Sequence, residues 1–184
     1  MATSLNERAQ RIELLLLDVD GVLTDGRLYF SETGDELKAF STLDGLGIKL
    51  LRRCGVKVGI ISGRRTDLVA RRALDLGLDL VIQGREDKWQ ALADWRRENP
   101  VALDRIAFMG DDWPDLTIMT RVGLALTVAN AHTSVSERAH WQSHRCGGDG
   151  AVREACDLLL KARGDFDRLL NEYLPSTSGD ERHA

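Results

Sequence analysis

The sequence predicts an α/β fold built on a parallel sheet with helices on both faces. Five short apolar runs, each bounded by Gly, Asp or Ser, have the length and continuity of strands buried on both faces. Amphipathic stretches separate the runs, and right-handed crossovers would wind them into a three-layer, doubly wound, Rossmann-like sheet. The predicted strands are Glu13–Leu17, Val56–Ile61, Leu80–Ile82, Ile106–Met109 and Leu124–Val128.

Apolar residues at helical spacing predict helices between these strands. They cover about 66–76, 87–98 and 151–161, and Asn99-Pro100 stops the second. One segment breaks the alternation of strand and helix. Residues 27–30 and 36–40 indicate two short strands joined by a turn over 31–35, which is a β-hairpin inserted directly after the first strand.

The chain has the size and composition of one domain. Its 184 residues are 43% hydrophobic, which is enough for a full core. We expect an N-terminal tail over 1–12, the domain over 13–163, and a flexible, polar tail over 164–184 that lacks sustained periodicity.

Charge and cysteine content point to a small-molecule partner in the cytoplasm. The 25 basic and 29 acidic residues give a net charge of −4, which offers no field to attract nucleic acid or an anionic membrane. The three cysteines form no Cys-x-x-Cys pair, so reduced thiols are expected. The only apolar run near the N-terminus, Leu14–Leu17, is too short for a signal peptide or a membrane span.

Polar side chains follow the predicted strands at the edge where parallel sheets bind ligands. Asp18 and Asp20 follow the first strand, Ser62 the second and Asp111 the fourth, while Lys88 begins a helix. Several carboxylates at one edge favour a hard cation, and Mg²⁺ takes one or two carboxylates together with a substrate phosphate. We expect Asp18, Asp111 and the backbone carbonyl of Asp20 to hold it.

The same residues suit phosphoryl transfer. A carboxylate such as Asp18 can attack phosphorus and form an aspartyl phosphate. Asp20, two residues on, could protonate the leaving oxygen and later activate water. Ser62 and Lys88 could bind the equatorial phosphoryl oxygens. The rival interpretation of an Asp-x-Asp-Gly segment is a calcium loop, but Val22 and Leu23 stand where further oxygen ligands would be needed.

Four segments in this order and spacing resemble the motifs of the haloacid dehalogenase superfamily of phosphatases. They are residues 18–26 (DVDGVLTDG), Ser62-Gly63-Arg64, Lys88 and Gly110-Asp111-Asp112. Residues 37–45 (LKAFSTLDG) and 147–154 (GGDGAVRE) are more narrowly similar to the 3-deoxy-D-manno-octulosonate 8-phosphate (KDO 8-phosphate) phosphatases, a subfamily without a cap domain. The resemblance runs from about residue 14 to 161 and implies a homotetramer in which the hairpin of one subunit covers a neighbour's active site.

Under this resemblance the substrate is a phosphorylated sugar acid from lipopolysaccharide synthesis. Cations are then expected at the sugar carboxylate and polar groups at its hydroxyls. The candidate substrate-binding residues are Asp20, Thr42, Asp44, Lys49, Gly63, Arg64, Arg72 and Lys88.

Several alternatives stay open. Arg64 and Arg72 could instead be solvent-facing helix charges, and residues 147–150 could be a phosphate cradle or only a glycine turn. Asp112 and Asp115 could support the metal or cap a helix. The function could be hydrolysis of another sugar-acid phosphate such as a nonulosonate 9-phosphate, or a non-catalytic role as a partner of a sugar-nucleotide enzyme.

Overall fold

A computed structural model describes residues 3–175, and it confirms the predicted parallel α/β sheet. Six strands lie in the order β5-β4-β1-β6-β7-β8, and all neighbouring pairs are parallel. The strands are β1 (Leu14–Leu17), β4 (Lys57–Ser62), β5 (Leu80–Gln83), β6 (Ile106–Gly110), β7 (Leu124–Thr127) and β8 (Trp141–Gln142).

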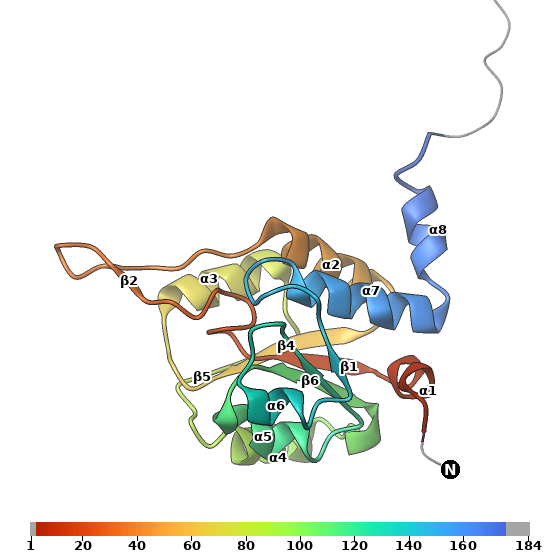
Figure 1. Cartoon of the computed structure of the whole chain (residues 1–184), viewed down its shortest axis with the longest axis horizontal. Coiled ribbons are helices and arrows are strands. Elements are labelled where there is room, and N and C mark those ends of the chain that lie inside the picture. Colours follow the sequence, from red (N-terminus) through yellow and green to blue (C-terminus); the bar gives the residue numbers. More distant parts are fainter. Residues whose placement is uncertain (1–2, 176–184) are drawn as a thin grey trace, which may run out of the picture.

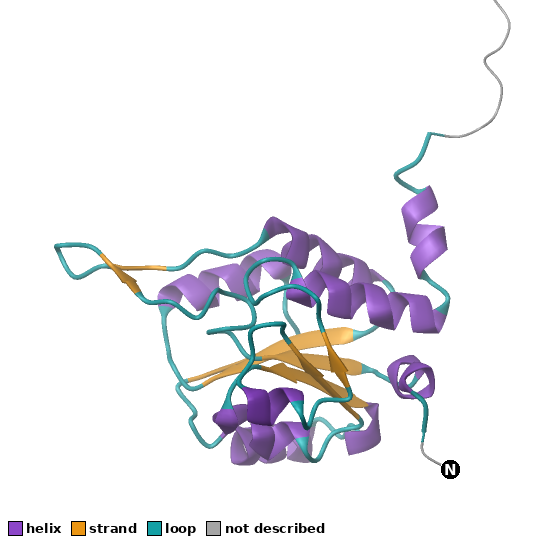
Figure 2. Ribbon diagram, in the orientation of Figure 1, coloured by secondary structure: helices purple, strands orange, loops and turns teal. Residues whose placement is uncertain are grey.

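Helices cover both faces of this sheet, so that the domain has three layers (Figures 1 and 2). On one side lie α2 (Thr42–Arg53), α3 (Asp67–Leu76) and α7 (Ala151–Arg163). On the other lie α4 (Lys88–Glu98), α5 (Trp113–Met119) and α6 (Thr133–Ser136). A 3₁₀ turn, Leu103–Arg105, precedes β6.

The central strand β1 shows why the sheet is buried on both faces. Successive side chains of a strand point to opposite sides. Leu15 and Leu17 accordingly join the core under α2 and α7, whereas Leu14 and Leu16 join the core under α4 and α5. All four leucines are fully buried, and burying each one contributes roughly 1.5–3 kcal/mol.

The hairpin is present but shorter than predicted. Only β2 (Tyr29–Phe30) and β3 (Glu36–Leu37) pair, in antiparallel register. The hairpin protrudes from the domain (Figure 1), and its apolar side chains stay exposed. Within residues 3–175 the chain contains no cap domain, because the hairpin is the only insertion between β1 and α2.

Each terminal segment contains a helix that was not predicted from the sequence. The expected N-terminal tail holds α1 (Leu5–Gln10), which begins with a capping box between Ser4 and Glu7. The expected flexible tail holds α8 (Phe166–Asn171), anchored by the buried side chain of Leu169. The rest of that prediction, over 176–184, lies outside the described residues. No helix among residues 3–175 is both long and apolar enough to cross a membrane.

Candidate active site

The register of the strands brings the predicted catalytic residues to one edge of the sheet. Asp18 continues β1, and its backbone N–H donates to the carbonyl of Met109 at 3.0 Å. Ser62 ends β4, and Gly110 ends β6 immediately before Asp111. The side chains open onto a cleft of about 640 Å³. It is lined by Asp18, Asp20, Ser62, Gly63, Arg64, Glu86, Lys88 and Pro114.

Lys88 lies between two carboxylates at the bottom of the cleft. Its Nζ donates to Oδ1 of Asp18 at 2.7 Å and to Oδ1 of Asp115 at 2.6 Å. All three side chains are at least nine-tenths buried. Burial alone lowers the pKa of a lysine, but the Asp115 and Asp18 charges outweigh it and raise the pKa of Lys88. Lys88 is therefore a fixed cation beside Asp18.

Three carboxylates meet closely enough to hold a metal ion. One oxygen each from Asp18, Asp111 and Asp115 lies within 4.8 Å of the others. Burial and the Asp115 charge raise the pKa of Asp18 to about 6, and burial with the Asp18 and Asp115 charges raises the pKa of Asp111 to about 8. Carboxylates crowded in this way are stabilised by a bound cation, so this donor set fits a hard divalent ion.

Asp115 serves the site differently from its neighbour Asp112. Its second oxygen, Oδ2, accepts the backbone N–H groups of Asp111 at 3.0 Å and Asp112 at 3.3 Å. Both oxygens of Asp115 are thus occupied, whereas within residues 3–175 the Asp111 carboxylate accepts no hydrogen bond. Asp112 is exposed and caps α5 through the N–H of Trp113. Asp112 therefore caps helix α5, whereas Asp115 supports Lys88 and the backbone at Asp111.

The loop after β1 depends on a close contact with Asp111. Gly21 has φ +103°, and a Cβ there would lie 2.2 Å from Oδ2 of Asp111. The glycine segment at 147–148 packs against the other side of this loop. A Cβ on Gly147 would lie 1.8 Å from the carbonyl oxygen of Gly21, and Gly148 N–H donates to the carbonyl of Val22 at 3.0 Å. These glycines support the catalytic loop, in agreement with the structural interpretation of residues 147–150.

Lys38 and Glu36, which were not predicted as site residues, contact two residues that line the cleft. Lys38 forms an ion pair with Oδ1 of Asp20, and Glu36 joins Lys38 at 3.1 Å and Arg64 at 2.9 Å. Lys38 lies inside the 37–45 segment that carries the resemblance, but neither its spacing nor its type indicated a place at the site.

Four predicted substrate-binding residues do not line the cleft. Asp44 is 1% exposed, and its Oδ1 accepts the backbone N–H of Arg153 at 2.8 Å, so it anchors the start of α7. Lys49 is exposed and lines a separate hollow between α2 and α3. Thr42 is the exposed first residue of α2.

Arg72 links α3 to the start of α2. Its guanidinium donates to the carbonyl of Ser41 at 3.2 Å and lies 5.8 Å from the ring centre of Phe40. None of these four side chains lines the cleft within this chain, and their role as contacts to the substrate stays a prediction.

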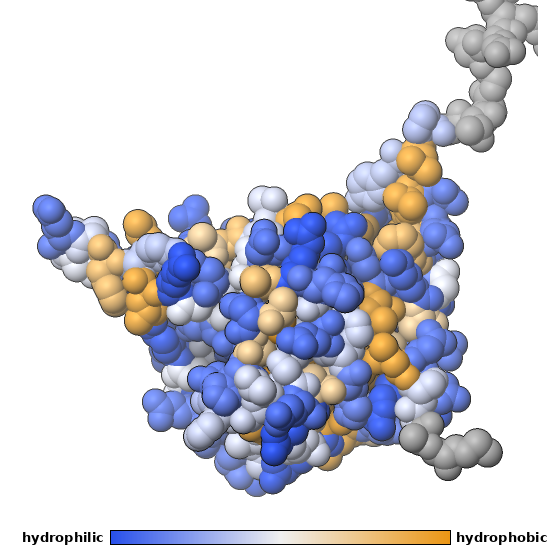
Figure 3. All heavy atoms as spheres, in the orientation of Figure 1, coloured by the Kyte–Doolittle hydropathy of each residue, from blue (hydrophilic) through white to orange (hydrophobic). Residues whose placement is uncertain are grey.

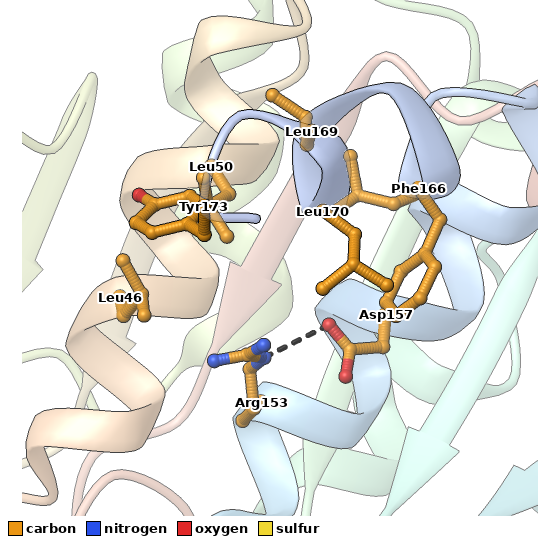
Figure 4. A pocket seen from close by; sticks show the side chains of 9 residues that line it. Leu46, Leu50, Arg153, Asp157, Phe166, Leu169, Leu170 and Tyr173 are labelled. Carbon is orange, nitrogen blue, oxygen red and sulfur yellow. Dashed lines mark hydrogen bonds and ion pairs between the residues drawn. The ribbon is translucent and has the colours of Figure 1, made fainter. Parts of the chain in front are cut away.

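A second cavity, of about 120 Å³, lies between α2, α7 and α8 (Figure 4). Leucine side chains from α2 and α8 line it together with Phe166 and Tyr173. Its charged groups, Arg153 and Asp157, pair with each other at 2.9 Å. With no unpaired charged group in its lining, this cavity lacks the means to bind a phosphate.

Known proteins resemble the chain over nearly its whole length. A family model described as haloacid dehalogenase-like hydrolase matches residues 77–153. The 3-deoxy-D-manno-octulosonate 8-phosphate phosphatase of Salmonella typhi is 43% identical over 167 residues, which are 91% of this chain and 89% of that protein.

Solved structures agree with this relationship. A probable YrbI family phosphatase from Pseudomonas syringae is 48% identical, with a TM-score of 0.91 over 93% of this chain and 97% of that one. The Moraxella catarrhalis 3-deoxy-D-manno-octulosonate 8-phosphate phosphatase, solved with magnesium, phosphate and KDO, is 37% identical, with a TM-score of 0.89 over 92% and 97%. With its carboxylate cluster at the same sheet edge that the motifs predicted, the chain belongs to the haloacid dehalogenase superfamily and, within it, to the KDO 8-phosphate phosphatase family.

Proposed function

We propose that this chain is a Mg²⁺-dependent phosphatase that hydrolyses KDO 8-phosphate to KDO and inorganic phosphate, in the synthesis of the lipopolysaccharide sugar. The observation that carries the proposal is the meeting of Asp18 and Asp111, at the carboxyl ends of β1 and β6, with Lys88 at the start of α4. Asp18 and Lys88 are buried and Asp111 is half-buried. Family membership supports the substrate, since the relatives named above act on this sugar acid.

Asp18 is the nucleophile in this proposal. One of its carboxylate oxygens attacks phosphorus, the bond from phosphorus to the sugar oxygen breaks, and an aspartyl phosphate forms. Lys88, 2.7 Å from Oδ1 of Asp18, fixes the direction of that carboxylate and with Ser62 binds phosphoryl oxygens. Asp20 lines the cleft, protonates the departing sugar oxygen, and later takes a proton from the water that attacks the aspartyl phosphate.

Asp18, Asp111 and the backbone carbonyl of Asp20 would hold the Mg²⁺. The ion would supply positive charge that reduces the repulsion between an anionic nucleophile and an anionic substrate. Gly63 and Arg64, on the loop after β4, line the mouth of the cleft and are placed to meet the substrate. Arg64 has the one guanidinium among the cleft residues, so it is our candidate for the sugar carboxylate.

Replacement of the nucleophile tests the proposal. Asp18→Asn keeps the shape of the side chain but cannot accept the phosphoryl group, so turnover of KDO 8-phosphate should fall at least about a thousandfold, a scale set by loss of a covalent step. Asp104→Asn, on an exposed carboxylate before β6, is the matched control and should keep wild-type kinetics. Excess EDTA should stop the wild-type enzyme and Mg²⁺ should restore it. Substantial turnover by Asp18→Asn would contradict the covalent mechanism.

The substrate alternatives separate in the same assay. A phosphatase for a nonulosonate 9-phosphate would prefer that ester in a panel of phosphorylated sugar acids. A non-catalytic partner of a sugar-nucleotide enzyme would hydrolyse none of them with Mg²⁺ present.

We further infer a cytoplasmic homotetramer in which the hairpin of one subunit covers a neighbour's cleft. Four apolar side chains of the hairpin are exposed, at 41–62%, and Figure 3 shows apolar (orange) atoms on the surface of the protruding hairpin. A two-stranded hairpin is marginal alone and leaves open edges. Symmetric assembly would cover these side chains, which are Leu28, Tyr29, Phe30 and Leu37. Free Cys54, Cys146 and Cys156 support the compartment, and nothing in the charge favours nucleic acid or a membrane surface as partner.

A further inference from the structure

A row of ion pairs connects two residues that line the cleft through two residues of the hairpin segment. It runs from Asp20 through Lys38 and Glu36 to Arg64. Asp20 and Arg64 line the cleft, whereas Glu36 is the first residue of β3 and Lys38 directly follows that strand. The Lys38 side chain is 1% exposed and those of Glu36 and Asp20 are about one-fifth exposed, so these ion pairs are mostly shielded from solvent.

Lys38 is the group that fixes the direction of the Asp20 carboxylate. Among residues 3–175 it is the only one that donates a hydrogen bond to that carboxylate. The backbone beyond Asp20 is held by the Thr24 hydroxyl, which accepts the N–H of Gly21 at 3.4 Å and donates to the carbonyl of Val19 at 3.3 Å. Those backbone contacts set the path of the loop but do not restrain the Asp20 side chain, so its direction depends on Lys38.

Lys38 is itself held from its other side. Oε1 of Glu36 lies 3.1 Å from Nζ of Lys38, and Oε2 of Glu36 accepts from Arg64 at 2.9 Å. A lysine is a flexible point charge, and a second carboxylate restricts where its ammonium can sit. The ammonium is therefore confined between Asp20 on the catalytic loop and Glu36 in strand β3 of the hairpin.

We propose that Lys38 is a positioning residue that holds the Asp20 carboxylate toward the leaving-group oxygen, and that the second strand of the hairpin thereby sets the alignment of proton transfer. The inference rests on the proposed role of Asp20 as general acid and base. Proton transfer by a side chain needs a heavy-atom distance of about 2.6–3.2 Å and contributes roughly 10²–10⁴ to the rate. If the Asp20 side chain rotated freely, proton transfer would be less well aligned and its contribution to the rate would be smaller.

A purely structural role for Lys38 would be to fasten the hairpin to the domain. Both roles predict a loss of activity on substitution, so the rate on one substrate cannot separate them. They differ in how the loss depends on the leaving group. A misaligned general acid slows esters whose alcohol needs a proton to depart, whereas a loosened hairpin slows all small esters alike.

The experiment uses the full chain with saturating Mg²⁺ and a series of substituted phenyl phosphates whose phenols range from strongly to weakly acidic. The quantity measured is the slope of log(kcat/KM) against the pKa of the phenol. For Lys38→Met we expect kcat/KM to fall roughly tenfold to a hundredfold for the least acidic phenol and less than about threefold for the most acidic, which is part of the general-acid factor. The slope therefore becomes steeper than in the wild type.

Control variants complete the design. Lys57→Met removes one positive charge from the exposed amino end of β4, away from the cleft, and should keep the wild-type slope. Asp20→Asn cannot donate the proton and gives the slope for complete loss of the general acid. Lys38→Gln removes the charge but leaves a polar group at this buried position, and it replaces Lys38→Met if that protein does not fold.

The slopes separate a failure of the proposed role of Lys38 from a failure of the proposed role of Asp20. A steeper slope for both Asp20→Asn and the Lys38 variants supports the inference. A steeper slope for Asp20→Asn with a parallel, uniformly lowered line for the Lys38 variants overturns it while leaving the proposed function intact. An unchanged slope for Asp20→Asn overturns the proposed role of Asp20, and with it the inference.

Discussion

Asp115 contacts both Lys88 and the backbone at Asp111, so we expect its removal to lower the free energy of unfolding. Its side chain is 1% exposed and accepts from Nζ of Lys88 at 2.6 Å and from the backbone N–H groups of Asp111 and Asp112. Asp115→Ala would leave a buried ammonium with Asp18 as its remaining partner and two N–H groups without theirs. Breaking a buried ion pair from one side costs about 3–5 kcal/mol, and a buried donor left unsatisfied costs about 1–3 kcal/mol.

Because Lys88 keeps Asp18 and the two N–H groups are only partly shielded, we expect a loss of about 3–5 kcal/mol in the free energy of unfolding. Chemical denaturation of the metal-free protein at fixed protein concentration measures it. The matched control is Asp112→Ala, which removes an exposed helix cap and should cost about 1 kcal/mol. Turnover by Asp115→Ala should fall at least tenfold, because both Lys88 and the Asp111 loop lose their support.

A loss below about 1 kcal/mol for Asp115→Ala, equal to that of the Asp112 control, would show that the buried contacts carry little of the stability. Retained turnover would further show that Lys88 and Asp111 hold their places without Asp115. Either result would refute the reasoning that assigns Asp115 a supporting role.

Two further predictions concern the hairpin and a buried carboxylate. The double variant Phe30→Ser, Leu37→Ser should dissociate the proposed tetramer in a sedimentation experiment and lower activity, and a fully active wild-type monomer at assay concentration would defeat the assembly proposal. Burial raises the pKa of Asp44 to about 6, although backbone N–H groups at the start of α7 oppose the shift. The unfolded chain then loses this proton near pH 3.8 and the folded chain only near 6, so stability falls as pH rises across that window. Asp44→Asn lacks this dependence, and its stability relative to wild type should rise by roughly 2 kcal/mol from pH 4 to pH 7 in denaturation curves. A constant difference across that range would contradict the assignment.

The sequence predicted the sheet well because its signal is local. Each long strand is a continuous apolar run, and a strand buried on both faces needs such a run whatever surrounds it. The short elements carry no such signal. Helices α1 and α5 are too brief to show periodicity, and only their capping boxes, Ser4 with Glu7 and Asp112 with Asp115, mark them in the sequence. The two-residue strand β8 is defined by its pairing with β7, which no local pattern encodes.

The residues of the site also differ in whether a local pattern marks them. Asp18, Ser62 and Asp111 were predictable because each follows a strand, and parallel strands end at one edge. Lys38 and the double role of Asp115 depend on how the hairpin and α5 fold back onto that edge. Lys49 was expected near the substrate because it is a cation close to a motif, whereas in this chain it lines a separate hollow between α2 and α3, a placement that no local pattern encodes.

The charges of the cleft explain why fixed lysines alone cannot bind a phosphate there. Lys88 is shared between two carboxylates, and Lys38 is shared between Asp20 and Glu36, so neither offers a full positive charge to the substrate. Asp111 forms no ion pair among residues 3–175, so burial and its acidic neighbours raise its pKa although the Lys88 charge opposes the shift. A phosphate dianion entering this group would meet uncompensated negative charge at close range. A further cation beside Asp18 and Asp111 would offset this negative charge, and the fixed lysines would then act mainly by holding the carboxylates in place.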